Sequence, residues 1–194
     1  KRMELEVHVC SRFGDYPGIS LAPYFHEVDI SDKIKIVELA KELQIDGILT
    51  TATDVCLEVI GAVVDEIGLI GTGLENSKAC LDKSLMKKRF FDYKVPTANY
   101  IEINKLQDAI EFFNKTKHAC VLKPTDSSGS RGVTKIENIL NIEKAYHEAL
   151  HFSKSRKVII EEWIEGEELG AQAVVVEGNL ALLILHSDIT TPPP

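Results

Sequence analysis

Short apolar runs alternate with helical apolar stripes over residues 5–70, and this alternation restricts the fold more than any other feature. Runs at residues 5–10, at 47–50 and from Leu69 are typical of strands. Two amphipathic helices are predicted between them by apolar residues at helical spacing: Ile36, Leu39, Ala40 and Leu43, then Leu57, Ile60, Val64 and Ile67. Strands alternating with helices predict an α/β fold whose parallel sheet is covered by helices.

Polar residues and a glycine mark where these two helices should begin and end. Ser31 is expected to cap the first helix, because a short side-chain oxygen can accept from the free N–H groups of a first turn. Asp54 is a candidate cap for the second helix, although it could also face a substrate amine. Gly68 is expected to end that helix, because glycine adopts the left-handed conformation easily.

The chain changes character after Gly73. A strongly basic helix is expected over residues 77–91, and Pro96 marks a domain boundary, because proline interrupts helices. Beyond Pro96 the elements follow a mixed order that is typical of an α+β region. They comprise helices at 105–114 and around Ile142, Ala145, Tyr146 and Ala149, strands at 119–123, 133–136 and 158–162, and a hairpin of 171–176 and 180–186 around Glu177, Gly178 and Asn179.

Net charge and cysteine spacing limit the kinds of partner and the cellular compartment that are expected. The 22 basic and 30 acidic residues give a formal net charge of -8, which argues against nucleic acid or an anionic membrane as the main partner. No apolar run approaches the ~20 residues of a membrane span. The four cysteines match no zinc or disulfide spacing, so free thiols and a cytoplasmic location are expected.

A loop of small polar residues follows a strand that ends at Lys123. Residues 125–132 include three serines and two glycines. Glycine lets backbone N–H groups approach an anion, serine adds hydroxyl donors, and lysine supplies the counter-charge for phosphate. The loop joins two strands, so it is neither a Walker loop nor a dinucleotide fingerprint. An ordinary polar hairpin loop would have the same composition.

A second candidate lies where the strand at 158–162 ends. An apolar pair, Trp163 and Ile164, follows two glutamates and precedes an acidic turn that includes Glu168. The apolar connector could receive the face of an adenine, and a carboxylate could accept from ribose hydroxyls. The alternative is a strand end with a solvated acidic turn. Lys83, considered alone, is an ordinary helix-surface lysine.

Taken together and in this order, Lys83, residues 121–133 and residues 160–168 resemble the ATP-grasp superfamily, in its branch of carbamoyl phosphate synthetase-like and carboxylate–amine ligases. The resemblance implies a pre-ATP-grasp domain at 1–75, a basic helical connector at 76–95, a lid subdomain at 96–168 and the start of the C-terminal lobe at 169–194. It also implies that the sequence is truncated at both ends, since it opens inside a strand and stops before most of that lobe.

The resemblance implies roles for individual residues. Lys83 and Lys123 would contact the α- and β-phosphates, and Glu161 would accept from the adenine amino group. The remaining contacts would come from a mobile phosphate loop, from residues lining the adenine and from a ribose ligand: Ser127, Ser128, Gly129, Ser130, Arg131 and Gly132; Glu162, Trp163 and Ile164; and Glu168. Mg2+ would bridge the phosphates through ligands beyond this chain, so no metal ligand is assigned. Asp188 is either an active-site group or a turn residue.

The activity implied is that of an ATP-dependent ligase, which forms an acyl phosphate from a small carboxylate, transfers it to an amine and releases ADP. Two alternatives stay open: a nucleotide-binding module without turnover, and a doubly wound domain with no nucleotide, in which the basic helix is a solvated face. The sequence identifies neither substrate, and it leaves a homodimer open.

Overall fold

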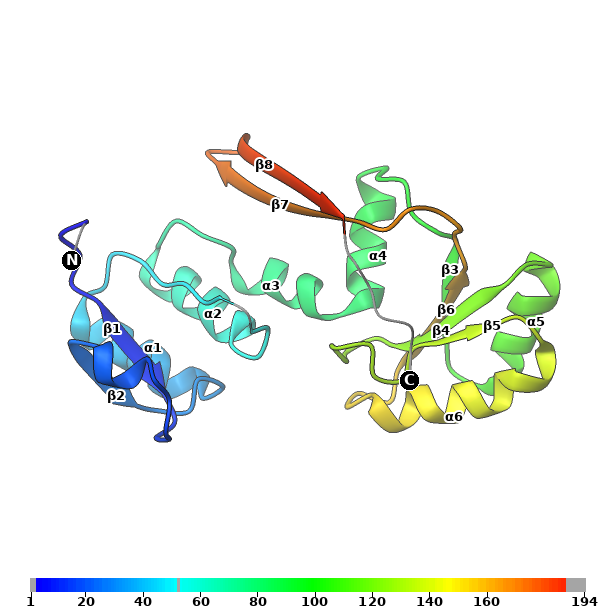
Figure 1. The fold of residues 1–194 in the computed structure, drawn as a ribbon, viewed down its shortest axis with the longest axis horizontal. Helices are drawn as coiled ribbons and strands as arrows, with labels where there is room; N and C mark the ends of the chain where they lie inside the picture. The colour runs from blue at the N-terminus through cyan, green and yellow to red at the C-terminus, as the bar shows by residue number, and fades with distance from the viewer. Residues whose placement is uncertain (1–2, 52, 188–194) are drawn as a thin grey trace. The chain divides into compact units, whose positions relative to one another are not determined.

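The computed structural model describes residues 3–51 and 53–187, which fall into two compact units, 1–162 and 163–194 (Figure 1). The first unit opens with a parallel pair, β1 (His8–Ser11) and β2 (Tyr24–Glu27), separated by a short 3-10 turn at Ile19–Leu21. Helices α1 (Lys33–Leu43) and α2 (Leu57–Ile67) follow. A core of buried residues joins them: Ile36, Ala40, Cys56, Val59 and Val63.

The predicted helix caps need correction. Asp32, and not Ser31, caps α1, because its carboxylate accepts from the Lys35 N–H at 3.2 Å. The Ser31 hydroxyl donates to Asp29 at 2.7 Å instead. The prediction that the Asp54 side chain caps α2 was wrong, because Cys56 holds the cap position and Asp54 offers only its main-chain oxygen. Gly68 ends α2 in the left-handed conformation, as predicted.

Two of the predicted strands are not strands. Residues 47–50 and 69–70 lie in irregular backbone, with Leu49 84% exposed and Ile70 fully exposed. Neither segment pairs with another strand within the described ranges, and a strand needs a partner for its backbone groups. Strand β2 was not predicted, because its four residues carry no clear alternation.

The basic helix expected over residues 77–91 is two helices, α3 (Leu74–Leu81) and α4 (Lys83–Asp92). Asp82 separates them: its backbone is extended, and its carboxylate accepts from the Leu85 N–H at 3.0 Å. A short polar side chain competes with the helix by capping the next one, which explains the break.

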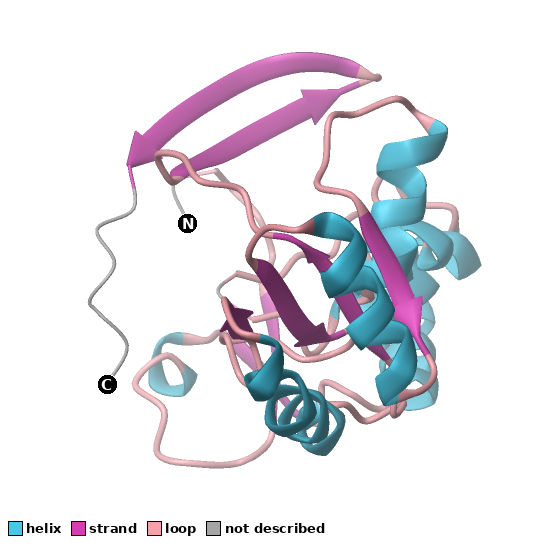
Figure 2. Ribbon diagram, turned by 90° about the vertical axis from the view of Figure 1, so that its right-hand side faces the viewer, coloured by secondary structure: helices cyan, strands magenta, loops and turns pink. Residues whose placement is uncertain are grey.

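A four-stranded antiparallel sheet forms the rest of the first unit, in the order β3 (Tyr100–Ile103), β6 (Val158–Glu162), β4 (Cys120–Pro124), β5 (Thr134–Ile136). Helices α5 (Leu106–Thr116) and α6 (Ile142–Phe152), the latter preceded by a 3-10 turn at Ile139–Asn141, pack beside it (Figure 2). The sequence did not predict β3, whereas it placed β6 within its observed bounds.

The second unit contains a single described motif, the hairpin of β7 (Leu169–Val176) and β8 (Asn179–Ser187), which confirms the predicted hairpin. Glu177 and Gly178 form its turn with φ of 49° and 77°. Two consecutive positive φ values suit a tight two-residue turn, whose twist matches that of the strands. Asp188 lies outside the described residues.

Candidate functional site

The antiparallel sheet has one apolar face, and a second face on which charged side chains follow buried Val121 and Ile159. Alternate residues of its strands, such as Leu122 and Ile160, join a core with α5 and α6 and are fully buried. The intervening residues point to the other side. Among them, Lys123 and Glu161 stand on the neighbouring strands β4 and β6. The polar face, made by Lys123, Glu161 and the side chains of α4 that reach them, is therefore fixed by strand register.

Glu161 is the centre of this polar face. It is only 6% exposed, and two ammonium groups contact its carboxylate. Lys123 Nζ pairs with Oε1, and Lys87 Nζ of α4 lies 2.6 Å from Oε2. A buried carboxylate stays charged only where such partners offset its loss of hydration. The predicted pair of Lys123 and Glu161 thus meets in space, in contact with each other.

Lys83, the other predicted phosphate ligand, lies beside this pair. Its Nζ donates to the Ser127 carbonyl at 2.6 Å, and its backbone N–H donates to the Thr125 carbonyl at 2.9 Å. Burial and then the charge of Lys123 lower the pKa of Lys83 below its ordinary value of 10.5. Two lysines that repel each other beside one carboxylate make a region suited to an anion.

The predicted phosphate loop is held at both ends and exposed between them. Lys83 holds its start at Ser127, and Gly132 at its end is buried against α6. Gly132 has φ of +70°, and a β-carbon there would lie 3.1 Å from the Phe152 side chain, so only glycine fits easily. Ser128, Gly129, Ser130 and Arg131 are exposed. The middle of the loop is therefore accessible to a ligand between two anchored ends.

Asp126 ties the loop to the turn after α6. Its carboxylate accepts from the Ser153 hydroxyl at 2.9 Å, the Lys154 N–H at 3.2 Å and the Ser155 N–H at 2.7 Å. Burial opposes ionisation, but the hydrogen bonds from Ser155 and Ser153 outweigh it and hold the pKa of Asp126 below its ordinary 3.8. Asp126 is thus a structural anchor for the loop.

Asp126→Asn is expected to lower the free energy of unfolding by about 1 kcal/mol at pH 7, after a discount for partial exposure. Because the folded pKa is lowered, the contribution is complete above pH 3.8 and disappears as pH falls through the folded pKa. Urea unfolding at pH 7 and in acid should therefore show the gap between variant and wild type closing in acid. A gap that is the same at both pH values would contradict the ionic role.

Two buried hydroxyl oxygens of the first unit, Ser84 Oγ and Thr125 Oγ1, make no hydrogen bond with any described residue. Glu161 Oε2 is also buried, but its contact with the Lys87 ammonium occupies only one of its two lone pairs. Buried polar atoms without partners are uncommon and call for a ligand or water. Two hydroxyl groups suit phosphate oxygens, and a carboxylate oxygen suits an amino group. The residues present therefore fit a nucleotide with a donor on its base.

Sequence reasoning missed Lys87, treating it only as one of several basic residues of a helix. The alternative in which that helix is a solvated face is wrong for Lys87, whose side chain is 11% exposed. The signal was available, because Lys83 and Lys87 are four residues apart and so share one helical face. Ser84 and Thr125 gave no signal, since hydroxyl residues are common at such positions.

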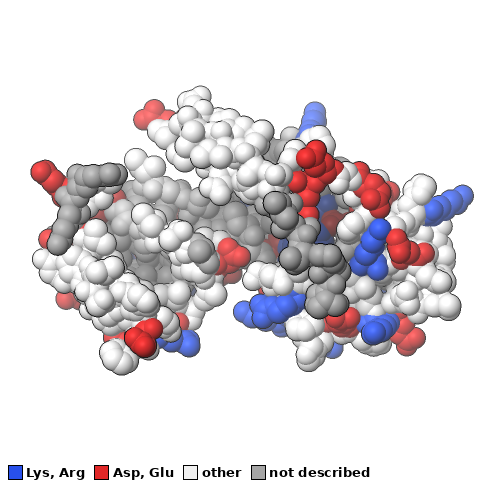
Figure 3. Space-filling model, in the orientation of Figure 1, with Lys and Arg blue, Asp and Glu red and all other residues white. Residues whose placement is uncertain are grey.

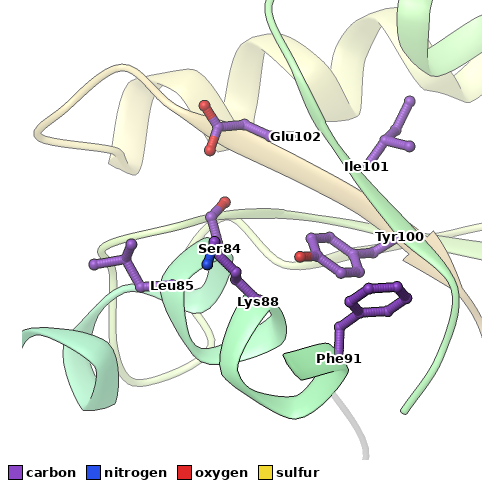
Figure 4. Close-up of a pocket in the computed structure, with 7 residues that line it drawn as sticks. All are labelled: Ser84, Leu85, Lys88, Phe91, Tyr100, Ile101 and Glu102. Carbon is purple, nitrogen blue, oxygen red and sulfur yellow. The ribbon is translucent and has the colours of Figure 1, made fainter. Parts of the chain in front are cut away.

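A shallow hollow lies between α4 and β3 at the edge of the polar face (Figure 4). Phe91 and Lys88 of α4 lie opposite Tyr100, and Ser84 lies opposite Glu102. Ile101 points away from them, as expected for the neighbouring position of a strand. The same alternation that faces Glu161 toward α4 therefore also faces Tyr100 there.

The predicted base-lining residues divide between the two units. Glu162 ends β6, where its carboxylate accepts from Asn99 Nδ2 at 2.9 Å. Trp163, Ile164 and Glu168 belong to residues 163–194, and all three are exposed. Their part in a nucleotide site stays a prediction.

The described residues contain neither a metal-binding cluster nor a membrane-spanning helix. Within residues 3–51 and 53–187, no three His, Cys, Asp or Glu side chains are grouped closely enough to hold a metal ion. In the same part of the chain, no helix has the length and apolar character needed to cross a membrane. On the face seen in Figure 3, acidic and basic side chains are interspersed. The polar face is therefore the candidate site.

Comparison with known proteins agrees with the fold. The structure resembles that of phosphoribosylglycinamide synthetase from Anaerococcus prevotii (TM-score 0.71, 25% identity, 95% of this chain and 46% of that chain). It also resembles L-amino acid ligase from Bacillus licheniformis (TM-score 0.74, 17% identity, 98% and 47%), a likeness that concerns the fold alone.

Curated relatives include D-alanine–D-alanine ligase of Finegoldia magna, 33% identical over 59% of this chain and 32% of that protein. Formate-dependent phosphoribosylglycinamide formyltransferase of Prochlorococcus marinus is 26% identical over 84% of this chain and 43% of that protein. The chain thus spans less than half the length of both relatives.

The fold and the family model identify an ATP-grasp protein. The model of the family "Phosphoribosylglycinamide synthetase, ATP-grasp (A) domain" matches residues 81–189. This match covers more than half of the 194 residues, and the chain belongs to that family.

Proposed function

We propose that this chain is the ATP-binding part of a ligase that activates a carboxylate as an acyl phosphate, transfers it to an amine and releases ADP. The supporting observation is the meeting of Lys83, Lys123 and Glu161 beside an exposed loop of serine and glycine. Phosphoryl transfer needs positioning and charge neutralisation more than a side-chain nucleophile. Two lysines and a mobile loop supply both, and the two relatives named above include a ligase.

In this proposal, Lys83 and Lys123 bind the α- and β-phosphates, and residues 127–132 fold over the β- and γ-phosphates. Glu161 accepts from the adenine amino group. The remaining contacts to the adenine come from Glu162, Trp163 and Ile164, and the ribose hydroxyls are bound by Glu168. When bound, Mg2+ would neutralise further phosphate charge, and we propose no ligand for it among the described residues.

The proposal extends to the cellular compartment, the assembly and the substrates of the enzyme. Four free thiols, at Cys10, Cys56, Cys80 and Cys120, favour the reducing cytoplasm. Association as a homodimer is proposed by analogy with one similar structure, a biotin carboxylase domain dimer in complex with MgADP. The carboxylate and the amine are proposed only as small molecules.

The ligase reaction can be tested by incubating the full-length protein that contains this chain with ATP, Mg2+ and pairs of small carboxylates and amines. Release of ADP that depends on the carboxylate, with a hydroxamate formed when hydroxylamine replaces the amine, is the expected result. Hydroxylamine attacks an acyl phosphate, so its product reports the intermediate directly. Saturable ATP binding without ADP release from any pair would overturn the ligase and leave a nucleotide-binding module.

A rise in pH is expected to weaken ATP binding through Lys83. Because the pKa of Lys83 is lowered from 10.5, its ammonium loses the proton at a lower pH than in free lysine, and phosphate attraction is lost with it. Lys83→Arg keeps its charge, since arginine titrates above pH 12. Calorimetry from pH 7.5 to 9.5 should show a larger loss of affinity in wild type than in the variant. Parallel pH profiles would contradict this role.

A further inference from the structure

Lys87 is the third lysine of the polar face, and the proposed function gives it no role. Its Nζ lies 2.6 Å from Glu161 Oε2, donates to Thr97 Oγ1 at 2.7 Å and donates to the Ala98 carbonyl at 3.3 Å. An ammonium group has three protons to donate. Lys87 is therefore held in place by three oxygen groups and is poorly suited to move onto a ligand.

Lys123 and Lys83 differ from Lys87 in this respect. Among the described residues, the Lys123 ammonium has one oxygen partner, Glu161 Oε1, and the Lys83 ammonium has the Ser127 carbonyl. Both therefore keep donors for phosphate. Once Lys123 binds phosphate, its ammonium interacts with both the ligand and Glu161, so it neutralises Glu161 less. Glu161 is buried and needs a counter-charge that does not leave it, and Lys87 is that charge.

The charge of Glu161 decides which base it prefers. An ionised carboxylate only accepts hydrogen bonds, whereas a protonated one can also donate. Oε2 is buried beside the Lys87 ammonium, and a carboxylate oxygen has a second lone pair with which it can still accept. Glu161, paired with two ammonium groups, can act only as an acceptor, so it favours a purine with an amino group at position 6 and disfavours one with a carbonyl oxygen there.

We propose that Lys87 is a positioning residue that sets base specificity: by pairing with Glu161 and fixing its orientation as a hydrogen-bond acceptor, it makes the site prefer ATP over GTP. This inference rests on the proposed function, because it requires a nucleotide in this site. It differs from that function in being a statement about the ratio of two affinities. The ratio can change while ATP still binds.

The experiment measures the dissociation constants of MgATP and MgGTP by calorimetry for wild type, Lys87→Met and Lys87→Arg. We expect Lys87→Met to reduce the ratio of GTP to ATP dissociation constants roughly tenfold, because a hydrogen bond to a charged group is lost. Lys87→Arg should restore part of the ratio, since it keeps the charge. Lys88→Met is the matched control, an exposed neighbour on α4 that pairs with Asp92 at 2.9 Å, and should leave the ratio unchanged.

The Glu161→Gln background separates a role through Glu161 from a general structural role. If Lys87 acts through this carboxylate, adding Lys87→Met to Glu161→Gln changes the ratio little further. Thermal unfolding monitored by circular dichroism checks that each variant is folded. Should Lys87→Met not fold, Thr97→Val keeps the charge and removes one of its anchors, and it should lower the ratio by a smaller factor.

The possible outcomes distinguish the role of Lys87 from the proposed nucleotide-binding function. A wild-type chain that binds neither nucleotide overturns both. A wild-type chain that prefers ATP, with Lys87→Met and Thr97→Val keeping the same preference, overturns the role of Lys87 alone. Equal effects of Lys87→Met with and without Glu161→Gln would also overturn it, by showing that Lys87 does not act through the carboxylate.

Discussion

Lys123→Ala is expected to weaken MgATP binding by about a hundredfold, the largest functional effect of any single substitution in this chain. Two losses combine. The phosphate loses a cation. Glu161 also loses one of its two ion pairs, so its negative charge repels the phosphates more strongly. A charge-assisted hydrogen bond is about twice as strong as a neutral one, and both losses are of this kind.

Calorimetric titration with MgATP measures this effect directly. Lys144→Ala is the matched control, because Lys144 is exposed on α6, the helix that covers the apolar face of the sheet. Lys123→Arg should retain part of the affinity, since it keeps the charge in a different geometry. If Lys123→Ala binds MgATP as wild type does, the polar face is not the nucleotide site, and the proposed function falls with it.

Leu122→Ala is expected to cost about 3–4 kcal/mol of stability, the largest structural effect among the substitutions considered. Leu122 is fully buried on β4, a central strand of the sheet, and belongs to the core shared with α5 and α6. Truncation removes contacts and leaves a cavity that neighbouring strands cannot close without breaking their hydrogen bonds.

Thermal unfolding of the first unit should show the change as a fall in melting temperature of roughly 10 °C. Leu140→Ala is the control. Leu140 is 82% exposed in the turn that precedes α6, so its truncation should shift the transition little. A similar loss in both variants would contradict the assignment of the core. A small loss in both would mean that the sheet is not the most stable part of the unit.

Periodicity determined most of the sheet and its helices. The apolar run of Val158, Ile159 and Ile160 favours a strand between two other strands, and β6 lies there with the predicted bounds. The stripe of Ile142, Ala145, Tyr146 and Ala149 is buried on α6 as expected. These patterns are local and repeat the period of one element, so a single sequence reveals them.

The sequence also determined that Lys123 and Glu161 face the same side, because each is a charged residue at the end of an apolar strand. It did not determine that they contact each other, since that depends on the register of β4 against β6. Register is set by pairing between segments 38 residues apart, which no local pattern contains. The role of Glu161 as the centre of a charge cluster follows only from that register.

Other features were decided by tertiary structure alone. The spacing of residues 47–50 is typical of a buried strand, yet Leu49 is exposed, because a strand forms only where a partner is available. Lys87 looks like its neighbour Lys88 in sequence, but the fold buries one beside Glu161 and leaves the other in water. Local sequence determined which residues could be buried or charged. The packing of α4 against the sheet decided which lysine became part of the site, because burial and counter-charge are properties of the assembled fold.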